Sequence, residues 1–489
     1  MEVSVEYSEK SLLCKIIISD VDVFERLREH FSIPNEGKKF IKGPRKRFIP
    51  DRIYFITPTG SCLFGMTPDM LAWIQKNVHD RTVKYKFSDD FKKRFALKEF
   101  KEEDIQDNLN FKLRDYQKEC VCLAMKHGFG TFVLGTGAGK TLTISSILHN
   151  LFYHKKIKKA MILVPDNGLV TQFNDELVNQ YGIKQKICLF YDKYNVIDKD
   201  ADIIIANRPL FLARFAANEK FFRDGLDCLI VDEAHSIKRD NKVSKMLEKI
   251  RADYRFGFTG TLAENIEDKY KNIGILGPIR YEKTSKELRD EGFLSSVLVN
   301  CLFLDYGQNI LGGLDYQGEK DLLSTLDIRN EFIAKLLCVC KKNSLVMVNY
   351  LNHGFALEEM TKKINEQMGS NKEIYFIRGE IETEARDEIK KLMEKNDNVI
   401  CIAITKIFST GINIKNLHNI VLAAGGKSSV TVVQSIGRGL RLHPDKKELN
   451  IWDIADKGYK YSLNHASRRR EIYEIEKIPM VSKTISISQ

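Results

Sequence analysis

The sequence of 489 residues lacks any apolar run long enough to cross a bilayer. Its longest apolar runs, such as Ala160–Val164, have the length of a β-strand. The first residues also lack the basic-then-apolar order that is typical of a secretory signal. These absences predict a protein of the cytoplasm without a membrane partner.

Cysteine spacing of the kind that holds a metal is also missing. The ten cysteines include no C-x-x-C pair, and the closest pairs, Cys120 with Cys122 and Cys338 with Cys340, are separated by one residue. We therefore expect reduced, mostly buried thiols rather than a metal site or a disulfide framework. The apolar fraction of 43% and charged fraction of 29%, without low-complexity segments, exclude collagenous and largely disordered classes. A chain of this length is expected to form about three domains.

The net charge of +11 is unevenly distributed. Residues 1–36 carry a net charge of −4, whereas residues 37–52 carry +6. Aromatic residues such as Phe40 and Phe48 are interleaved with the bases, which suits nucleic acid because cations neutralise phosphates and flat rings stack on bases. The alternative is a solvated hairpin whose aromatic residues enter a small core. The predicted nucleic-acid contacts of this segment are Lys38, Lys39, Lys42, Arg45, Lys46 and Arg47.

The pattern of apolar, polar and charged residues changes along the chain. Residues 1–85 alternate like short strands and two helices, which predicts a small α+β module, and residues 86–108 are charged and suit a linker. From residue 109, short β-branched runs alternate with amphipathic stretches, which predicts parallel α/β units over 109–285 and 286–489. The strands expected on this basis are 131–134, 160–164, 203–206, 228–231 and 255–258 in the first unit, and 345–348, 374–377, 399–404, 420–423 and 451–454 in the second.

A glycine-rich loop follows the first of these strands and precedes a helical stretch. Glycines let backbone N–H groups turn toward phosphate oxygens, and a helix N-terminus adds a favourable dipole. In this pattern Lys140 is expected to reach the β- and γ-phosphates of ATP, and the Thr141 hydroxyl to bind Mg²⁺. The alternative is a glycine-rich turn with an incidental lysine. The predicted nucleotide-binding loop consists of Gly135, Thr136, Gly137, Ala138, Gly139, Lys140 and Thr141.

A second strand, Cys228–Val231, runs directly into two carboxylates. Asp232 is expected to hold Mg²⁺ through its water shell, and Glu233 to orient the attacking water. The alternative is that one of the two carboxylates caps the next helix. Asp453 and Asp456, in contrast, are expected to end a strand near the C-terminus rather than to bind metal.

Arginines three residues apart mark the second α/β unit. Arg438 and Arg441 follow Gln434 in the run Gln434–Arg441 and share one face of a helix or turn. From the second unit they could reach across an interdomain cleft and stabilise charge on the γ-phosphoryl group, which is a contribution of roughly 10³–10⁵ in rate. We therefore assign Gln434, Arg438 and Arg441 to hydrolysis.

Taken in order, these motifs resemble those of the superfamily 2 helicases of the DEAH type over residues 110–460. The resemblance implies two tandem RecA-like domains, with Gln117 in Leu113–Gln117 reading the adenine base. It places Pro165 and Gln172 along the nucleic-acid backbone, and in Ser409–Asn413 it assigns Thr410 to nucleic acid and Gly411 to the nucleotide. Asn207–Arg208 stands where the family more often has a Thr-x-Gln pattern.

Finer features, including Thr383–Arg386, Phe408–Leu417 and Trp452-Asp453, resemble the phage UvsW-type helicases. This resemblance implies ATP- and Mg²⁺-dependent unwinding and branch migration of forked or four-way DNA, and also the removal of RNA–DNA hybrids. For a phage-encoded chain the cytoplasm is that of the infected host. Two alternatives stay open: an RNA-remodelling ATPase of the same superfamily, and an ATP-gated nucleic-acid clamp that does not unwind.

Overall fold

The computed structural model divides the chain into two compact units, residues 1–134 with 139–283, and residues 135–138 with 284–489. Each unit is described by itself. The residues that the structure describes are 1–8, 11–40, 43, 47–79, 82–106, 110–239, 241–262, 265–307, 314–377, 391–405, 414–423, 446 and 448–487.

The first unit begins with a small α+β module, as the sequence predicts. Its sheet has the strand order β5-β2-β1-β6, and one face carries buried residues such as Val3, Val5 and Ile16. The alternation of buried and exposed residues along β1 and β2 gives the sheet one core face, which α1 and α2 cover. The module's elements are β1 (Glu2–Tyr7), β2 (Leu13–Ile18), α1 (Val21–His30), β3 (Ser32–Pro34), β4 (Arg52–Tyr54), β5 (Ser61–Leu63) and α2 (Thr67–Asn77).

This module continues beyond residue 85. Strand β6 (Lys84–Phe87) pairs in parallel with β1, and helix α3 (Asp89–Phe95) follows it with its N-terminus capped by Ser88. The predicted boundary at residue 85 therefore falls inside a strand, and half of the predicted linker 86–108 belongs to the module. Most residues of α3 are charged, so composition alone predicts a linker here, but Phe91 is buried in the module's core.

Within the first unit, the module packs directly on the following α/β sheet. The Phe64 and Phe95 rings lie 5.2 and 5.1 Å from the Phe129 ring of the first central strand. Arg94 lies over both Phe64 and Phe129 at about 5 Å and donates to the Asp253 carbonyl oxygen. The module and the first sheet therefore share a continuous aromatic core.

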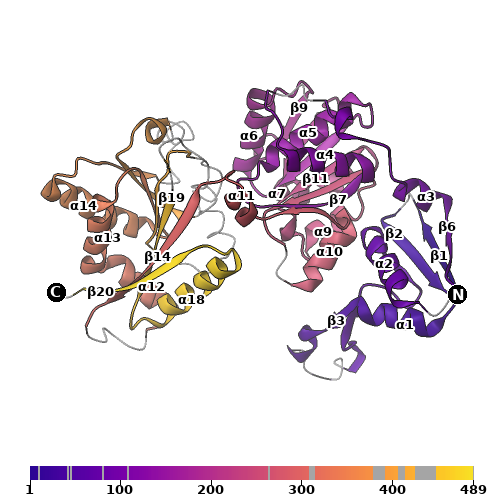
Figure 1. Cartoon of the computed structure of the whole chain (residues 1–489), viewed down its shortest axis with the longest axis horizontal. Helices are drawn as coiled ribbons and strands as arrows, with labels where there is room; N and C mark the ends of the chain where they lie inside the picture. Colours follow the sequence, from indigo (N-terminus) through magenta and orange to yellow (C-terminus); the bar gives the residue numbers. More distant parts are fainter. Residues whose placement is uncertain are drawn as a thin grey trace. The chain divides into compact units, whose positions relative to one another are not determined.

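The sheet of the first α/β domain has seven strands in the order β13-β7-β12-β11-β8-β10-β9, and every neighbouring pair is parallel. Helices α4 and α5 pack together on one face, and α9 and α10 on the other (Figure 1). The strands are β7 (Phe129–Leu134), β8 (Ala160–Val164), β9 (Ile187–Phe190), β10 (Ile203–Asn207), β11 (Cys228–Asp232), β12 (Tyr254–Thr259) and β13 (Ile279–Lys283). The helices are α4 (Asp115–His127), α5 (Lys140–Tyr153), α6 (Asn167–Asp175), α7 (Arg208–Arg214), α8 (Glu219–Asp224), α9 (Lys242–Leu247) and α10 (Ile266–Leu276).

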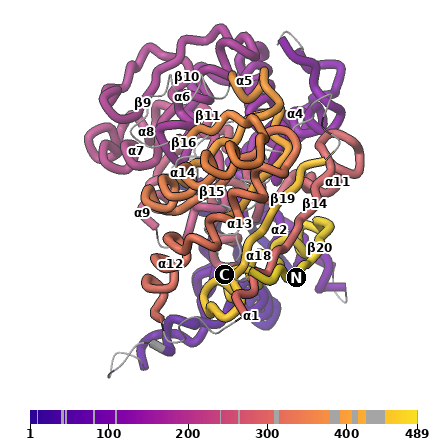
Figure 2. The backbone as a smooth tube through the Cα atoms, turned by 90° about the vertical axis from the view of Figure 1, so that its left-hand side faces the viewer, coloured from indigo at the N-terminus to yellow at the C-terminus, as the bar shows by residue number. Residues whose placement is uncertain are grey.

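The second unit contains another seven-stranded sheet, in the order β16-β17-β15-β18-β19-β14-β20, and its neighbouring strands are again parallel. The long strands β14 and β19 lie side by side (Figure 2). The strands are β14 (Ser296–Asp305), β15 (Ser344–Val348), β16 (Glu373–Ile377), β17 (Val399–Ile404), β18 (Asn419–Leu422), β19 (Glu448–Asp456) and β20 (Met480–Ser486). The helices that the structure describes here are α11 (Ser285–Asp290), α12 (Tyr316–Thr325), α13 (Asp327–Val339), α14 (Leu351–Met368) and α18 (Lys460–Ile475).

These two sheets confirm the predicted parallel α/β architecture. Nine of the ten cysteines are buried, as expected, and Cys122 is half-buried. Among the described residues, no helix is long and apolar enough to cross a membrane.

Candidate functional site

The glycine-rich loop connects β7 to α5, as the sequence predicts. Gly137 and Gly139 adopt positive φ angles of 85° and 77°, which favour glycine. Gly139 caps the N-terminus of α5, and a Cβ atom there would come within 2.6 Å of the Gln117 Nε2 atom. A Cβ atom on Gly135 would meet the Ser285 backbone nitrogen at 2.5 Å. Three positions of the loop are therefore restricted to glycine by conformation or close contact, and the loop leads into the N-terminus of a helix, where the helix dipole favours an anion.

Lys140, the first residue of α5, donates a hydrogen bond from Nζ to Glu233 Oε1 at 3.0 Å. Burial lowers the pKa of Lys140, but the carboxylates of Glu233 and Asp232 outweigh it, so the net pKa is raised. Burial alone would raise the pKa of Glu233, but Lys140 and His235 hold this pKa well below its usual range. Glu233 is therefore ionised beside the cation of the loop.

Asp232 ends the buried strand β11, and its environment differs from that of Glu233. It is 4% exposed, and its Oδ1 atom is buried with no hydrogen-bond partner among the residues that the structure describes. Burial raises the pKa of Asp232 despite the nearby Lys140 cation, and the Glu233 charge raises it further. A buried carboxylate oxygen that accepts no hydrogen bond has lost its hydration without a replacement. Hard divalent cations such as Mg²⁺ take carboxylate oxygens of this kind as ligands. The residues thus fit Mg²⁺, with the half-buried Thr141 next to Lys140 on the first turn of α5.

Glu233 has a left-handed backbone, with φ 49° and ψ 52°. Arg208 holds this turn by donating to the carbonyl oxygens of Asp232 and Glu233, the latter at 3.0 Å, and to the Ser236 hydroxyl. The Ser236 hydroxyl in turn donates to the Glu233 carbonyl oxygen at 2.7 Å. From the sequence Arg208 stands out only as a departure from the family pattern, because nothing in the sequence shows which carbonyl groups a guanidinium 24 residues before Asp232 will reach.

The turn formed by Asp232 and Glu233, called the acidic turn below, is also connected to strand β12. His235 Nδ1 lies 2.9 Å from Thr259 Oγ1 and 3.3 Å from Glu233 Oε2. Thr259 ends β12, and its hydroxyl donates to the Thr261 carbonyl oxygen at 2.6 Å. The carboxylate that faces Lys140 is thus connected through one imidazole to the segment after β12.

Gln117 lies buried near the start of α4, beside the loop. Its Oε1 atom accepts from the Arg114 backbone nitrogen at 3.0 Å, which closes the first turn of the helix. The structure thus brings Gln117, Gly139, Lys140, Asp232 and Glu233 into one neighbourhood of the first sheet's carboxyl edge, as the motif order predicts.

Two predicted nucleic-acid contacts, Pro165 and Gln172, lie just before α6 and on it. Pro165 lies in the half-buried connection between β8 and α6. Gln172 donates from Nε2 to Glu176 Oε1 at 2.7 Å, and its Oε1 atom is buried. Asn167, on the first turn of α6, accepts a hydrogen bond from Asn207.

The described cations of the module's basic segment differ in their contacts. Lys38 forms an ion pair with Asp51 at 2.7 Å, and Lys39 pairs with Glu36. Arg47 instead lies over the ring of Phe48, which is 75% exposed, at 4.8 Å. Of the segment's described cations, Arg47 thus retains the exposed cation–aromatic arrangement that the nucleic-acid hypothesis requires. The predicted contacts Lys42, Arg45 and Lys46 lie outside the described residues.

The predicted site residues of the second domain also lie outside the described residues. These residues are Thr410, Gly411, Gln434, Arg438 and Arg441. Their roles therefore stay predictions. The strands that flank them, β17, β18 and β19, are present as expected.

Comparisons with known proteins identify the two α/β units. Residues 110–264 match the family model described as the res subunit of type III restriction enzymes, and residues 329–443 match the helicase conserved C-terminal domain. The chain is 28% identical to the ATP-dependent DNA helicase uvsW of Enterobacteria phage T4, over 95% of this chain and 96% of that protein. It is 26% identical to the DNA 3'-5' translocase XPB2 of Sulfurisphaera tokodaii, over 78% of this chain and 92% of the relative.

A structural likeness supports the fold. The Saccharomyces cerevisiae protein Dbp5, bound to RNA and ADP BeF3, superposes with a TM-score of 0.51 and 16% identity over 76% of this chain and 90% of that one. The two parallel seven-stranded sheets are tandem RecA-like domains, as predicted.

Proposed function

Because the chain belongs to the superfamily 2 helicases, we propose that it couples ATP hydrolysis to the unwinding and branch migration of forked or four-way DNA. The observation that carries the proposal is the contact of Lys140 with Glu233 beside the Oδ1 atom of Asp232, which has no hydrogen-bond partner among the residues that the structure describes. A phosphate-binding cation, a carboxylate held ionised and a carboxylate available to a metal are the parts that nucleoside triphosphate hydrolysis needs.

In this function Lys140 exchanges its ion pair with Glu233 for the phosphate oxygens of ATP, which carry more negative charge. Glu233 is then free to accept a hydrogen bond from water and to orient its oxygen toward the γ-phosphorus. The water oxygen forms a bond to phosphorus as the bond to the bridging oxygen breaks, and ADP leaves with the electron pair of that bond. The proton lost by the water passes by way of Glu233 to a phosphate oxygen or to solvent. His235 and Arg208 keep the carboxylate and its backbone in place during this exchange.

Asp232 and Thr141 would hold Mg²⁺, which neutralises charge on the phosphate oxygens when it is bound. The buried Oδ1 atom of Asp232 supports this assignment, since a carboxylate that served only the fold would have its oxygens satisfied by donors.

Branched DNA as the substrate is supported by the similarity to uvsW over nearly the whole length of both proteins and by the basic N-terminal module. A direct test measures ATP hydrolysis with single-stranded, duplex, forked and four-way DNA, with RNA, and with an RNA–DNA hybrid. Strand separation of a four-way junction is then followed with Lys140→Ala and with Lys156→Ala, whose exposed side chain follows α5, as the matched control.

We expect ATP-dependent separation by the parent and by Lys156→Ala, and none by Lys140→Ala. Stimulation by RNA alone would replace the proposal with the RNA-remodelling ATPase. Tight ATP-dependent binding without strand separation on any branched substrate would replace it with the nucleic-acid clamp.

The N-terminal module is proposed to select the junction through its basic segment. Replacing Arg45, Lys46 and Arg47 with alanine should weaken junction binding and reduce the salt dependence, by about 0.9 in slope for each phosphate that these cations no longer neutralise. A matched charge control replaces the exposed residues Lys155, Lys156 and Lys158, which lie on the loop after α5. Equal junction affinity in both triple variants would assign the basic segment to the solvated surface.

A further inference from the structure

The backbone of the Asp232–Glu233 turn is held by Arg208, which with Asn207 forms the junction between β10 and α7. Asn207 ends β10 and caps α7, and its Oδ1 atom accepts from the Leu210 backbone nitrogen at 2.9 Å. The Asn207 Nδ2 atom donates to Asn167 Oδ1 on the first turn of α6. The next residue, Arg208, extends the other way, to the Asp232–Glu233 turn. Two consecutive side chains therefore contact two separate elements of the site.

The contacts of Arg208 suit a positioning role. Its Nη2 atom donates to two successive carbonyl groups, those of Asp232 and Glu233, and Nη1 donates to the Ser236 hydroxyl, which itself bonds the Glu233 carbonyl group. These are the acceptors of a peptide that turns sharply, because Glu233 is in the left-handed region. A non-glycine residue pays a conformational cost there and keeps the conformation only where its surroundings enforce it. The planar guanidinium is suited to this, since it presents several donors in a fixed geometry.

The direction of the Glu233 side chain follows from this backbone. With the turn held, the Glu233 carboxylate meets Lys140 on one side and His235 on the other. A change in φ at Glu233 would redirect the carboxylate, and misplacement of a reacting group by about 1 Å reduces a rate by about 10²-fold. In its described contacts Arg208 bonds the backbone of Asp232 and Glu233 and not the phosphate loop, so its replacement should disturb the Asp232–Glu233 turn more than the binding of phosphate.

We propose that Asn207 and Arg208 form a positioning pair, in which Arg208 fixes the carboxylate of Glu233 for hydrolysis and Asn207 transmits the position of α6 to it. The pair rests on the proposed function, because α6 follows the connection that contains Pro165 and carries Gln172, two predicted nucleic-acid contacts. Nucleic acid that shifts the first turn of α6 moves Asn167 and therefore Asn207, and the peptide bond to Arg208 carries the shift to the hydrolytic turn. Stimulation of hydrolysis by nucleic acid then has a physical route within one domain.

The positioning role is tested in the full-length chain without nucleic acid. Arg208→Gln removes the guanidinium, Arg208→Lys keeps the charge but loses the fork, and Arg214→Gln is the matched control, because Arg214 ends the same helix with an exposed side chain. We expect kcat for ATP hydrolysis to fall on the order of 10²-fold in Arg208→Gln and less in Arg208→Lys. The KM for ATP and the affinity for a non-hydrolysable ATP analogue should stay within about twofold, since the loop and Lys140 are intact.

Three results would overturn the positioning role. They are a kcat within twofold of the parent in Arg208→Gln, a loss of analogue binding that parallels the loss of kcat, and equal losses in the lysine and glutamine variants together with a lowered melting temperature. If Arg208→Gln fails to fold, Arg208→Lys supplies the same comparison of kcat with KM. A parent chain that hydrolyses no ATP contradicts the proposed function instead, so the two failures are distinguishable.

The coupling role has a sharper variant. Asn207→Asp keeps the oxygen that caps α7 but replaces the Nδ2 donor with a second oxygen, which faces Asn167 Oδ1 without a proton to share. The ratio of DNA-stimulated to basal ATPase should fall at least threefold in this variant, and in Arg214→Gln it should stay at the parent value. An unchanged ratio in Asn207→Asp would show that α6 and the acidic turn are independent.

Discussion

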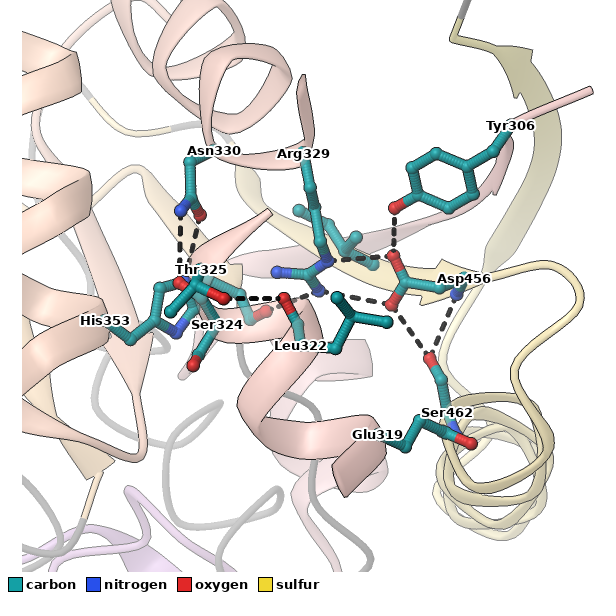
Figure 3. A network of polar contacts seen from close by, with 12 residues as sticks. Tyr306, Glu319, Leu322, Ser324, Thr325, Arg329, Asn330, His353, Asp456 and Ser462 are labelled. Atoms are coloured by element: carbon teal, nitrogen blue, oxygen red, sulfur yellow. Dashed lines mark hydrogen bonds and ion pairs between the residues drawn. The ribbon is translucent and has the colours of Figure 1, made fainter. Parts of the chain in front are cut away.

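Two buried aspartates end parallel strands in the two RecA-like domains, and their surroundings differ. Asp232 ends β11 with its Oδ1 atom lacking a hydrogen-bond donor among the described residues. Asp456 ends β19, and its carboxylate accepts from Arg329 Nε at 2.8 Å, Tyr306 OH at 2.7 Å and Ser462 Oγ at 2.9 Å (Figure 3). Both residues are less than 5% exposed.

The pKa shifts of the two aspartates follow these differences. Burial raises the pKa of both groups, but Arg329 and the hydroxyl donors overcome it at Asp456, where the net pKa is lowered. At Asp232 burial prevails, and the pKa is raised. A buried carboxylate whose oxygens all accept hydrogen bonds serves the fold. A buried carboxylate with an oxygen that accepts none can still bind a ligand. The comparison thus separates an acid that serves the fold from the acid proposed to bind a metal, without reference to motifs.

Replacing Asp232 should have the largest effect on activity. In Asp232→Asn, kcat for ATP hydrolysis should fall about 10³-fold, because several kcal/mol of charge stabilisation by the metal are lost. The free energy of unfolding should stay equal or rise, since an uncompensated buried charge is removed. Steady-state ATPase assays and urea denaturation of the same preparation measure both quantities. A strongly destabilised Asp232→Asn would mean that this carboxylate also serves the fold.

Asp456→Asn should show the opposite pattern. Its carboxylate is the ion-pair partner of Arg329, so the change leaves a buried guanidinium without compensation, and unfolding of the second unit should become easier by about 3 kcal/mol. Urea denaturation followed by far-ultraviolet circular dichroism measures the loss. Asp305→Asn is the matched control, because Asp305 ends the neighbouring strand β14 and pairs with Lys457 at a partly exposed site. Equal losses in the two variants would remove the distinction between saturated and exposed carboxylates.

Strands that appear as continuous apolar runs could be predicted from the sequence, and most strands without such a run could not. Strands β8 and β17 have the predicted bounds, because central parallel strands are buried on both faces and appear as continuous apolar runs. The predictions missed β14, an interior strand in which buried and half-buried residues alternate, and three strands at sheet edges, β9, β13 and β20. Apolar runs there are interrupted by charges such as Glu282 and Lys483.

The site shows a similar division. The phosphate loop and the acidic pair are local patterns, so the placement of Lys140 after β7 and of Asp232 and Glu233 at the end of β11 could be predicted from the sequence alone. The contact of Arg208 with the acidic turn depends on β10 and β11 lying on either side of β8 in the sheet. Strand β19 ends at Asp456, as expected. The ion pairs of Asp453 with Arg469 and of Asp456 with Arg329 could not be predicted, because no pattern in the nearby sequence indicates them.

Magnesium should distinguish the two aspartates in a binding measurement. ADP with Mg²⁺ should raise the stability of the parent chain by up to about 2.7 kcal/mol at a ligand concentration 100 times the dissociation constant. The magnesium-dependent part of this gain, measured against ADP with a chelator, should disappear in Asp232→Asn and persist in Asp456→Asn. Thermal unfolding over a magnesium titration supplies the comparison. A magnesium-dependent gain that survives in Asp232→Asn would assign the metal to other residues.

The smallest expected effect is a difference in pH dependence without nucleotide or metal. The pKa of Asp232 is raised in the folded chain, so its ionisation opposes folding; the penalty is absent below the unfolded value near 3.8 and complete above the folded pKa. The stability gap between Asp232→Asn and the parent should therefore close by about 2 kcal/mol as the pH falls from about 7 toward 4. The pKa of Asp456 is lowered, so its contribution is present above the unfolded value and is lost only as the pH falls toward the folded pKa. The gap between the parent and Asp456→Asn should thus stay constant over the same range and narrow only below about pH 4. Urea midpoints of the three chains at stepped pH test both statements, and parallel curves for the two variants would contradict the assignment of one acid to function and the other to the fold.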